Sequence, residues 1–175
     1  MRSLIGYVPQ DQFLFASSIL DNIRFGNPDF SIDKVEEATK LAQVYDDIKD
    51  MPEGFETIIG EKGVSLSGGQ KQRLAMSRAM ILNPEILILD DSLSAVDAKT
   101  EHAIIDNLKH TRKDKTTIIT AHRLSAVVHA DLILVMQDGR IIERGRHDDL
   151  LAQGGWYAKT YESQQLEMEG GEAHA

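Results

Sequence analysis

Two short apolar runs in the second half of the chain indicate strands of a parallel sheet. Residues 86–89 read Ile-Leu-Ile-Leu and residues 116–120 read Thr-Thr-Ile-Ile-Thr, and a helical pattern over 99–109 lies between them. Continuous apolar runs of this length are typical of strands that are buried on both faces of a sheet. The order strand, helix, strand predicts a right-handed crossover within one sheet. A further short strand is expected at residues 4–8.

Helical spacing of apolar residues dominates the first half of the chain. Residues 17–24 predict a short helix with a serine cap. Residues 33–48 predict a longer amphipathic helix, because apolar side chains recur three and four positions apart. Asp33 and Glu36 lie three residues apart at its start, as a capping-box pair does. The sequence Pro-Glu-Gly at 52–54 is expected to end this helical segment.

The last third of the chain predicts a hairpin followed by a helix. Residues 132–136 and 140–143 are strand-like and flank Asp-Gly at 138–139, a dipeptide that favours tight hairpin turns. Residues 148–166 predict a C-terminal helix. Residues 167–175 are rich in Gly, Glu and Ala, and we expect them to be disordered.

Composition narrows the class of protein. The 175 residues are 42% hydrophobic, which suits one ordinary globular domain. The 28 acidic residues exceed the 19 basic ones and give a net charge of -9, so nucleic-acid binding is not expected. The sequence has no cysteine, which excludes disulfides and thiolate metal sites. No apolar run is long enough to span a membrane and no signal peptide opens the chain, so a cytosolic location is expected.

A glycine-containing segment starts one of the predicted helices. Residues 66–70 read Leu-Ser-Gly-Gly-Gln and precede a helical stretch that runs to Leu82. Ser67 is placed to cap this helix, and Gln70, three residues on, completes a capping box. The two glycines remove side chains where the backbone approaches another group, and the free N–H groups of a helix start suit a phosphate. Taken alone, the segment also fits, and rather favours, a well-capped helix start with no ligand.

Two carboxylates end the first apolar run. Asp90 and Asp91 follow residues 86–89 directly, and ligands of open α/β sheets bind at the carboxyl ends of the strands. One carboxylate there can hold Mg²⁺ beside bound phosphates. The second can orient or deprotonate an attacking water. The alternative is that the two acids cap the following turn.

Further polar residues are expected at the same edge of the sheet. His122 follows the strand at 116–120, and Gln10 follows the strand at 4–8. The Ser-Ala-Val-Asp segment at 94–97 makes a turn or a helix start. A histidine in this position is as often a structural hydrogen-bonding residue as a catalytic one, and a loop glutamine alone says little.

These elements occur together in one order, and the combination resembles the ATP-binding-cassette (ABC) ATPases. The resemblance rests on Tyr7-Val8-Pro9-Gln10, Leu66-Ser67-Gly68-Gly69-Gln70-Lys71-Gln72-Arg73, Ile86-Leu87-Ile88-Leu89-Asp90, Ser94-Ala95-Val96-Asp97 and His122. It covers nearly the whole chain up to Trp156, and the block from Leu66 to Arg73 is highly specific. It implies an α/β fold, a P-loop NTPase-type ABC ATPase core with a parallel sheet plus an α-helical subdomain, with the N-terminal part of the domain missing.

The same resemblance implies four segments in the chain. Residues 1–16 are expected to carry the Q-loop strand and loop, and residues 17–82 the helical subdomain with the signature motif. The α/β core with the Walker B, D-loop and H-loop motifs is expected over 83–155. The C-terminal helix and tail occupy 156–175.

The resemblance also implies a role for each motif residue. Nucleotide binding is implied for the signature residues Leu66, Ser67, Gly68, Gly69 and Gln70, for the D-loop residue Asp97 and for the switch histidine His122. Metal binding is implied for Gln10 of the Q-loop and the Walker B residue Asp90, and a part in hydrolysis for Asp91, His122 and Gln10. The implied cofactors are ATP and Mg²⁺. In this family two domains sandwich two ATP molecules, so the implied partners are a second nucleotide-binding domain and the coupling helices of a transmembrane domain.

Three further segments are similar to multidrug and lipid exporters. They are Gln12-Phe13-Leu14-Phe15, Gly60-Glu61-Lys62-Gly63 and Glu143-Arg144-Gly145-Arg146-His147-Asp148-Asp149-Leu150. Glu61 matches the exporter position that contacts the coupling helices. The resemblance therefore implies the ATP-hydrolysing motor of a membrane exporter for drug or lipid-like substrates, at the cytoplasmic face of the cell membrane. In such exporters the membrane domain is usually fused upstream on the same chain.

Two departures from the family pattern limit what the chain does alone. No G-x-x-x-x-G-K-[ST] loop occurs in the sequence, although this loop supplies the N–H cradle and the lysine for the phosphates. We expect the chain to be inactive alone because it lacks this loop. Because Met1 stands almost directly before a strand, we also expect a truncated product or gene model. Asp91 stands where active members usually carry glutamate. This resembles the degenerate site of heterodimeric exporters, in which the partner is a different half-transporter.

Two alternative functions remain beside the exporter motor. The chain also fits a degenerate, non-catalytic half that dimerises when ATP binds, because Asp91 weakens its own site while its signature motif is intact. A soluble cassette ATPase that acts on ribosomes or DNA is the second alternative. The acidic balance and the exporter-like region around Glu61 weigh against that alternative.

Overall fold

The computed structural model describes residues 4–60 and 63–172. The chain forms two compact units, residues 1–121 and residues 122–175. The first unit contains a parallel sheet with helices beside it, and the second contains a hairpin and two helices. This mixed α/β architecture confirms the predicted fold class.

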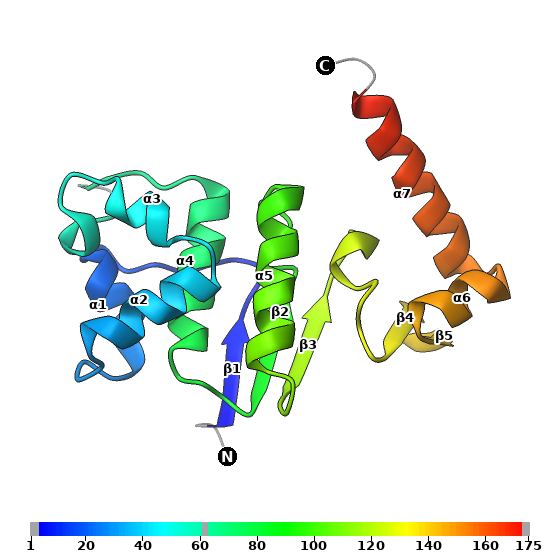
Figure 1. The fold of residues 1–175 in the computed structure, drawn as a ribbon, viewed down its shortest axis with the longest axis horizontal. Helices are drawn as coiled ribbons and strands as arrows, with labels where there is room; N and C mark the ends of the chain where they lie inside the picture. The colour runs from blue at the N-terminus through cyan, green and yellow to red at the C-terminus, as the bar shows by residue number, and fades with distance from the viewer. Residues whose placement is uncertain (1–3, 61–62, 173–175) are drawn as a thin grey trace. The chain divides into compact units, whose positions relative to one another are not determined.

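Three parallel strands form the sheet of the first unit. They are β1 (Ile5–Val8), β2 (Ile86–Asp90) and β3 (Thr116–Thr120), in the order β1-β2-β3. Figure 1 shows them side by side, and the register pairs Tyr7 with Ile88 and Ile88 with Ile118. The carboxyl ends of all three strands therefore lie at one edge, with Asp90 directly opposite Thr120. The prediction of a parallel sheet is confirmed.

The two faces of this sheet differ in burial. On one face Val8, Leu87 and Leu89 are at most 1% exposed, and α4 (Gly68–Met80) packs against β1 and β2. On the other face Tyr7 is 54% and Ile118 46% exposed. The prediction that residues 116–120 form a buried strand is therefore wrong at Ile118. The reason is that no described element of the first unit covers this face, so its apolar side chains stay exposed.

Short helices follow β1 and form the helical part of the first unit. They are α1 (Ile19–Ile23), the 3₁₀ turn η2 (Arg24–Gly26), α2 (Ile32–Leu41), α3 (Tyr45–Lys49) and the turn η3 (Gly54–Glu56). Ser18 caps α1, as the sequence predicts. In Figure 1 these helices gather with α4 on one side of the strands.

The long helix predicted over 33–48 is two helices. The chain breaks after α2 because Gln43 takes a left-handed backbone with φ of 56°, which ends an α-helix. The capping prediction is also wrong, since the helix starts one residue earlier than Asp33. Ser31 is the N-cap, and its hydroxyl accepts from the backbone N–H of Lys34.

Two longer helices frame the second half of the first unit. The capping box at the start of α4 is present: Ser67 Oγ accepts from the N–H of Gln70, whose side chain accepts from the N–H of Ser67. The helix ends at Met80, two residues before the predicted end. Helix α5 (Ala98–Thr111) has Asp97 as its N-cap, and the Asp97 carboxylate accepts from the N–H of Thr100. The segment at 94–97 is thus the turn and helix start that the sequence predicts.

The second unit begins with the turn η4 (Leu124–Ala126) and the hairpin β4 (Ile133–Gln137) and β5 (Arg140–Gly145). Asp138 and Gly139 have φ angles of 50° and 73°, as a tight primed turn requires, so the hairpin prediction is confirmed. Helices α6 (His147–Gln153) and α7 (Trp156–Glu172) follow. The buried core of the second unit includes Leu124, Ile133, Val135, Leu150 and Tyr157.

Two predictions for the C-terminal segment are wrong. They are the single helix over 148–166 and the disorder from residue 167 onward. Gly154, with φ of 63°, ends α6 and separates it from α7. The predicted disorder from residue 167 onward is also wrong as far as Glu172, because α7 continues to that residue. Extending an existing helix costs little free energy compared with starting one. Helix α7 therefore continues into a segment whose composition alone suggests disorder. Residues 173–175 lie outside the described residues.

Candidate functional site

Asp90 lies at the carboxyl end of the central strand and is held from both neighbouring strands. The Tyr7 hydroxyl donates to Asp90 Oδ2 at 3.0 Å, and the Thr120 hydroxyl donates to Asp90 Oδ1 at 2.6 Å. The Thr120 hydroxyl, and then that of Tyr7, lowers the pKa of the Asp90 carboxyl. The group is therefore ionised at neutral pH, as a Mg²⁺ ligand must be. Tyr7 and Thr120 are positioning residues that sequence analysis alone does not assign.

The turn after Asp90 fixes the second acid. Asp91 has a left-handed backbone with φ of 45°, a conformation that short polar residues such as Asp tolerate better than most. Its N–H donates to the backbone oxygen of Thr120 at 3.1 Å and to the Thr120 hydroxyl at 3.0 Å. The buried Ser92 hydroxyl donates to the carbonyl of Val8 at 3.0 Å. These bonds anchor the backbone of the turn to β1 and β3, and the Asp91 side chain remains half-buried.

Helix α4 packs directly on the turn that follows the two acids. Gln72, which is 4% exposed, donates to Ser94 Oγ at 3.1 Å and accepts from the N–H of Ala95 at 3.0 Å. A Cβ atom at Gly69 would lie 2.7 Å from the backbone oxygen of Ala95. Glycine is thus required at 69 by a contact within this chain. Gln72 and Gly69 join the signature segment to the residues after Asp91.

The start of α4 faces outward at Ser67 and Gly68, and we call these two residues the signature corner. Ser67 and Gly68 are exposed, and a Cβ atom at Gly68 would meet Ala95 at an ordinary 3.4 Å. Leu66, directly before Ser67, is only 8% exposed and anchors the start of α4. Gln70 donates to Asp47 Oδ1 at 2.9 Å, which ties the helix start to α3. The helix start therefore leaves Ser67 and Gly68 at the surface.

The remaining predicted site residues are placed separately. Gln10 is exposed directly after β1. The Asp97 carboxylate is engaged as the cap of α5, and the Thr100 N–H lowers its pKa. His122 is the exposed first residue of the second unit, and its nearness to Asp90 stays a prediction. Glu61 lies outside the described residues.

An exposed aromatic cluster is formed by residues that follow Gln10 in the sequence. Phe15 stacks on Phe25 with ring centroids 4.4 Å apart and meets Phe13 edge-on at 5.0 Å. Phe13 and Phe25 are 66% and 62% exposed. Arg78 lies against the rings of Phe15 and Phe25, and it donates to the backbone oxygens of Phe13 and Asn22 at 2.8 Å each. We call Phe13, Phe15 and Phe25 the aromatic patch; the sequence shows the phenylalanines but not that they meet.

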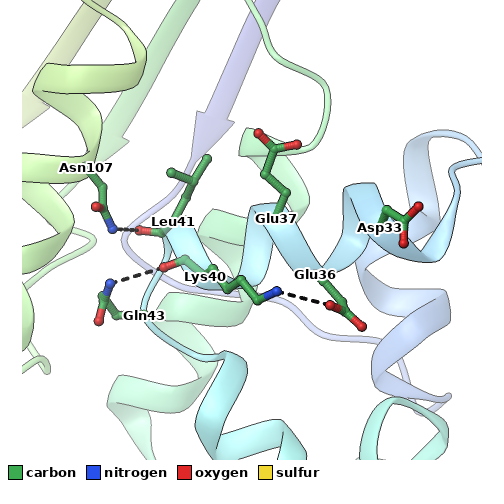
Figure 2. A pocket seen from close by; sticks show the side chains of 7 residues that line it. All are labelled: Asp33, Glu36, Glu37, Lys40, Leu41, Gln43 and Asn107. Atoms are coloured by element: carbon green, nitrogen blue, oxygen red, sulfur yellow. Dashed lines mark hydrogen bonds and ion pairs between the residues drawn. The ribbon is translucent and has the colours of Figure 1, made fainter.

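Figure 2 shows a groove elsewhere on the first unit, on α2 and α5. Its lining consists of Asp33, Glu36, Glu37, Lys40, Leu41, Gln43 and Asn107. Lys40 pairs with Glu36 at 3.1 Å, and Asn107 donates to the backbone oxygen of Leu41 at 3.0 Å. None of the predicted site residues lines this groove, and its acids are exposed or half-buried side chains of a solvated helix.

Comparison with known families decides the class of protein. The profile of the family described as ABC transporter matches residues 1–94, which include the signature segment and both acids. The chain belongs to the ABC transporter family. This ABC transporter chain carries the ABC ATPase fold, and the family binds ATP, typically with Mg²⁺.

Individual relatives agree with the family assignment. "Probable multidrug resistance ABC transporter ATP-binding/permease protein YheI" of Bacillus subtilis is 58% identical over 166 residues, which are 95% of this chain and 28% of the relative. "Multidrug resistance-like ATP-binding protein MdlA" of Escherichia coli is 51% identical over 166 residues, with the same two shares. A solved structure of a bacterial Atm1-family ABC exporter with ATP bound is similar with a TM-score of 0.86 and 42% identity, over 93% of this chain and 28% of that one.

This ABC transporter chain thus spans 28% of the length of these relatives. Within residues 4–60 and 63–172, no helix combines the length and the apolar character that crossing a bilayer requires. The geometry fits a Mg²⁺ ligand at Asp90, because the carboxylate is ionised and stands at the open edge of the sheet. Ser67 and Gly68 are exposed at the capped start of α4.

Proposed function

We propose that the chain is part of the ATP-driven motor of a membrane exporter and completes an ATP site on a second nucleotide-binding domain. The observation that carries this proposal is the capped start of α4, where Ser67 and Gly68 are exposed while Gly69 packs on the chain's own turn. A helix start that is capped and open offers N–H groups to a phosphate of another subunit. A merely structural helix start would not need the exposed glycine.

Asp90, Asp91, Gln10 and His122 serve the chain's own ATP site in this proposal. Asp90 holds Mg²⁺ through its oriented carboxylate, while Asp91 and His122 act on the attacking water and the γ-phosphate. Gln10 contacts the metal from the end of β1. Each ATP then lies between the sheet edge of one chain and the signature corner of the other.

The exposed face of the sheet supports the proposal that a further segment, which carries the phosphate-binding loop, completes the chain's own ATP site. Tyr7, Ile88 and Ile118 form one row across the three strands, and Asp90 and Thr120 stand on the same face. Apolar side chains in a row of this kind are normally covered. We infer that a layer carrying the phosphate-binding loop covers this face in the working motor.

The 175-residue chain alone is expected to bind Mg-ATP with a dissociation constant above about 1 mM. The cradle of N–H groups and the lysine that hold the phosphates are absent from its sequence. Isothermal titration calorimetry checks this expectation. The matched control is the same sequence within a longer polypeptide that includes a G-x-x-x-x-G-K-[ST] loop, which should bind in the micromolar range. Micromolar binding by the short chain would contradict the proposal.

Asp91 supports a heterodimer in which this chain's own site is degenerate. A carboxylate shortened by one methylene reaches the attacking water poorly, whereas the signature motif of the same chain is intact. The partner in this proposal is a different half-transporter that carries the intact glutamate. The second candidate function, a half that only dimerises when ATP binds, rests on the same residue.

The aromatic patch supports coupling to a transmembrane domain. It follows Gln10 in sequence, it is exposed, and Arg78 fixes the backbone that carries Phe13. Aromatic side chains that are held rigidly at a surface are typical anchors of protein interfaces. We propose that a coupling helix of the membrane domain packs against the aromatic patch, at the cytoplasmic face of the membrane.

Phe25→Ala is expected to uncouple ATP hydrolysis from transport in the assembled transporter. The truncation of an exposed aromatic anchor costs about 1–2 kcal/mol, so transport per ATP should fall on the order of ten-fold. Phe30→Ala, which truncates an aromatic outside the patch, is the control. Transport and ATPase rates are measured together in proteoliposomes. A Phe25→Ala transporter with an unchanged ratio of transport to hydrolysis would refute the proposed contact.

A further inference from the structure

One amide side chain of the C-terminal helix holds the backbone around His122. Gln164, on α7, donates through Nε2 to the backbone oxygen of His122 at 2.9 Å. The same amide accepts, through Oε1, from the backbone N–H of Leu124 at 2.9 Å. The two bonds bracket the segment from His122 to Leu124, which lies about forty positions earlier in the chain. An amide that uses its donor and its acceptor on two backbone groups fixes both their separation and their orientation.

Helix α7 is itself firmly attached within the second unit. The Glu143 carboxylate, on β5, accepts from the N–H groups of Trp156 and Tyr157 at 2.5 and 3.1 Å. A carboxylate at a helix start is favourable both as a hydrogen-bond acceptor and toward the helix dipole. Tyr157 is fully buried, and its hydroxyl bonds to the ring nitrogen of His147 at 2.8 Å. The hairpin therefore fixes α7, and α7 in turn presents Gln164.

Only the backbone of His122 is engaged by Gln164, and its imidazole remains exposed. Leu124, on the other side of the bracket, is 7% exposed and belongs to the core of the second unit. A loop residue anchored on one side by a core leucine and held at its own carbonyl has few backbone conformations left. Its side chain keeps a fixed origin while it stays free to contact a ligand.

We propose that Gln164 is a positioning residue for His122, so that the C-terminal helix sets the reach of the switch histidine toward the nucleotide. This inference rests on the proposed function of His122 in hydrolysis. Gln164 contacts neither nucleotide nor metal in this role. It acts through the carbonyl of His122 and the N–H of Leu124, and its loss should affect the chemical step more than ATP binding.

Gln164→Leu removes both bonds at similar side-chain length, and Gln164→Glu keeps the acceptor for Leu124 but loses the donor to His122. The neighbouring Gln165→Leu is the matched control, because Gln165 is also half-buried and carries the same amide. Amide hydrogen exchange at Leu124 is measured on the 175-residue chain. ATPase kcat and KM are measured on the full transporter that contains it, with His122→Ala as the reference for complete loss of the histidine.

The expected result for Gln164→Leu is loss of exchange protection at Leu124 and a fall in kcat of about three- to ten-fold, with KM for ATP unchanged. Gln164→Glu should keep the protection and lose part of kcat, and Gln165→Leu should change neither. Unaltered exchange at Leu124 in Gln164→Leu would overturn the bracket itself. Unaltered kcat, in a transporter that His122→Ala inactivates, would overturn the positioning role. If His122→Ala leaves turnover intact, it is the proposed function of His122 that fails, and the positioning role fails with it.

Discussion

Asp91→Glu should raise ATP turnover at this chain's own site, on the order of 10²-fold, in the assembled transporter. The added methylene extends the carboxylate by about 1.5 Å toward the attacking water. The backbone of the turn is anchored to Thr120 by two hydrogen bonds, so the extra length is added to a fixed origin. The gain is accompanied by backbone strain of about 1 kcal/mol, because the φ of 45° at this position favours short polar side chains.

Single-turnover ATP hydrolysis with the partner's own site inactivated measures this effect directly. Asp91→Asn is the matched control, since it keeps the length and the tolerance for a left-handed backbone but cannot act as a base. It should leave turnover as low as in the natural sequence or lower. An Asp91→Glu transporter that assembles fully and hydrolyses no faster would speak against a degenerate site caused by the short acid.

The two signature glycines are expected to respond differently to alanine. Gly69→Ala places a Cβ atom 2.7 Å from the backbone oxygen of Ala95, so the turn must shift, and unfolding should become easier by about 1–3 kcal/mol. Gly68→Ala meets only an ordinary contact at 3.4 Å, and alanine suits a helix better than glycine. Its stability should be unchanged or slightly higher. Its cost should appear instead at the partner's ATP site, as a fall in turnover of about ten-fold or more, because the methyl group separates the helix start from the phosphate.

Each variant thus serves as the control for the other. Denaturant unfolding of the 175-residue chain measures the stability arm, and ATP hydrolysis at the partner's site, with this chain's own site inactivated, measures the functional arm. A Gly69→Ala chain as stable as the natural one would contradict the internal contact with Ala95. Full turnover with Gly68→Ala would contradict the proposal that the start of α4 contributes to the ATP site of another subunit.

Local chemistry made much of the fold predictable. The apolar runs at 86–89 and 116–120 are strands, the Asp-Gly turn at 138–139 closes a hairpin, and Ser67 with Gln70 makes the capping box that their spacing indicates. Each of these features depends on residues a few positions apart. Two helix predictions failed where a backbone angle decided the outcome. Apolar spacing continues through Gln43, for example, although its left-handed conformation breaks the helix.

The site was predictable as a set of residues but not as a set of contacts. Asp90 could be placed at the carboxyl end of a strand from the pattern alone. The hydroxyls of Tyr7 and Thr120 that hold its carboxylate come from strands 83 and 30 positions away in sequence. The bond from Gln72 to Ser94 likewise depends on how α4 packs on the turn. Such pairings follow from tertiary packing, which spacing along the chain does not encode.

The uncovered face of the three-stranded sheet has a practical consequence for the isolated polypeptide. Tyr7 and Ile118 offer water an apolar surface, and β3 has only β2 as a neighbour within the described residues. Free strand edges and apolar patches attract one another. The isolated polypeptide is therefore expected to aggregate or to be degraded in a cell. Its synthesis has to be matched to that of the segment that covers the sheet face.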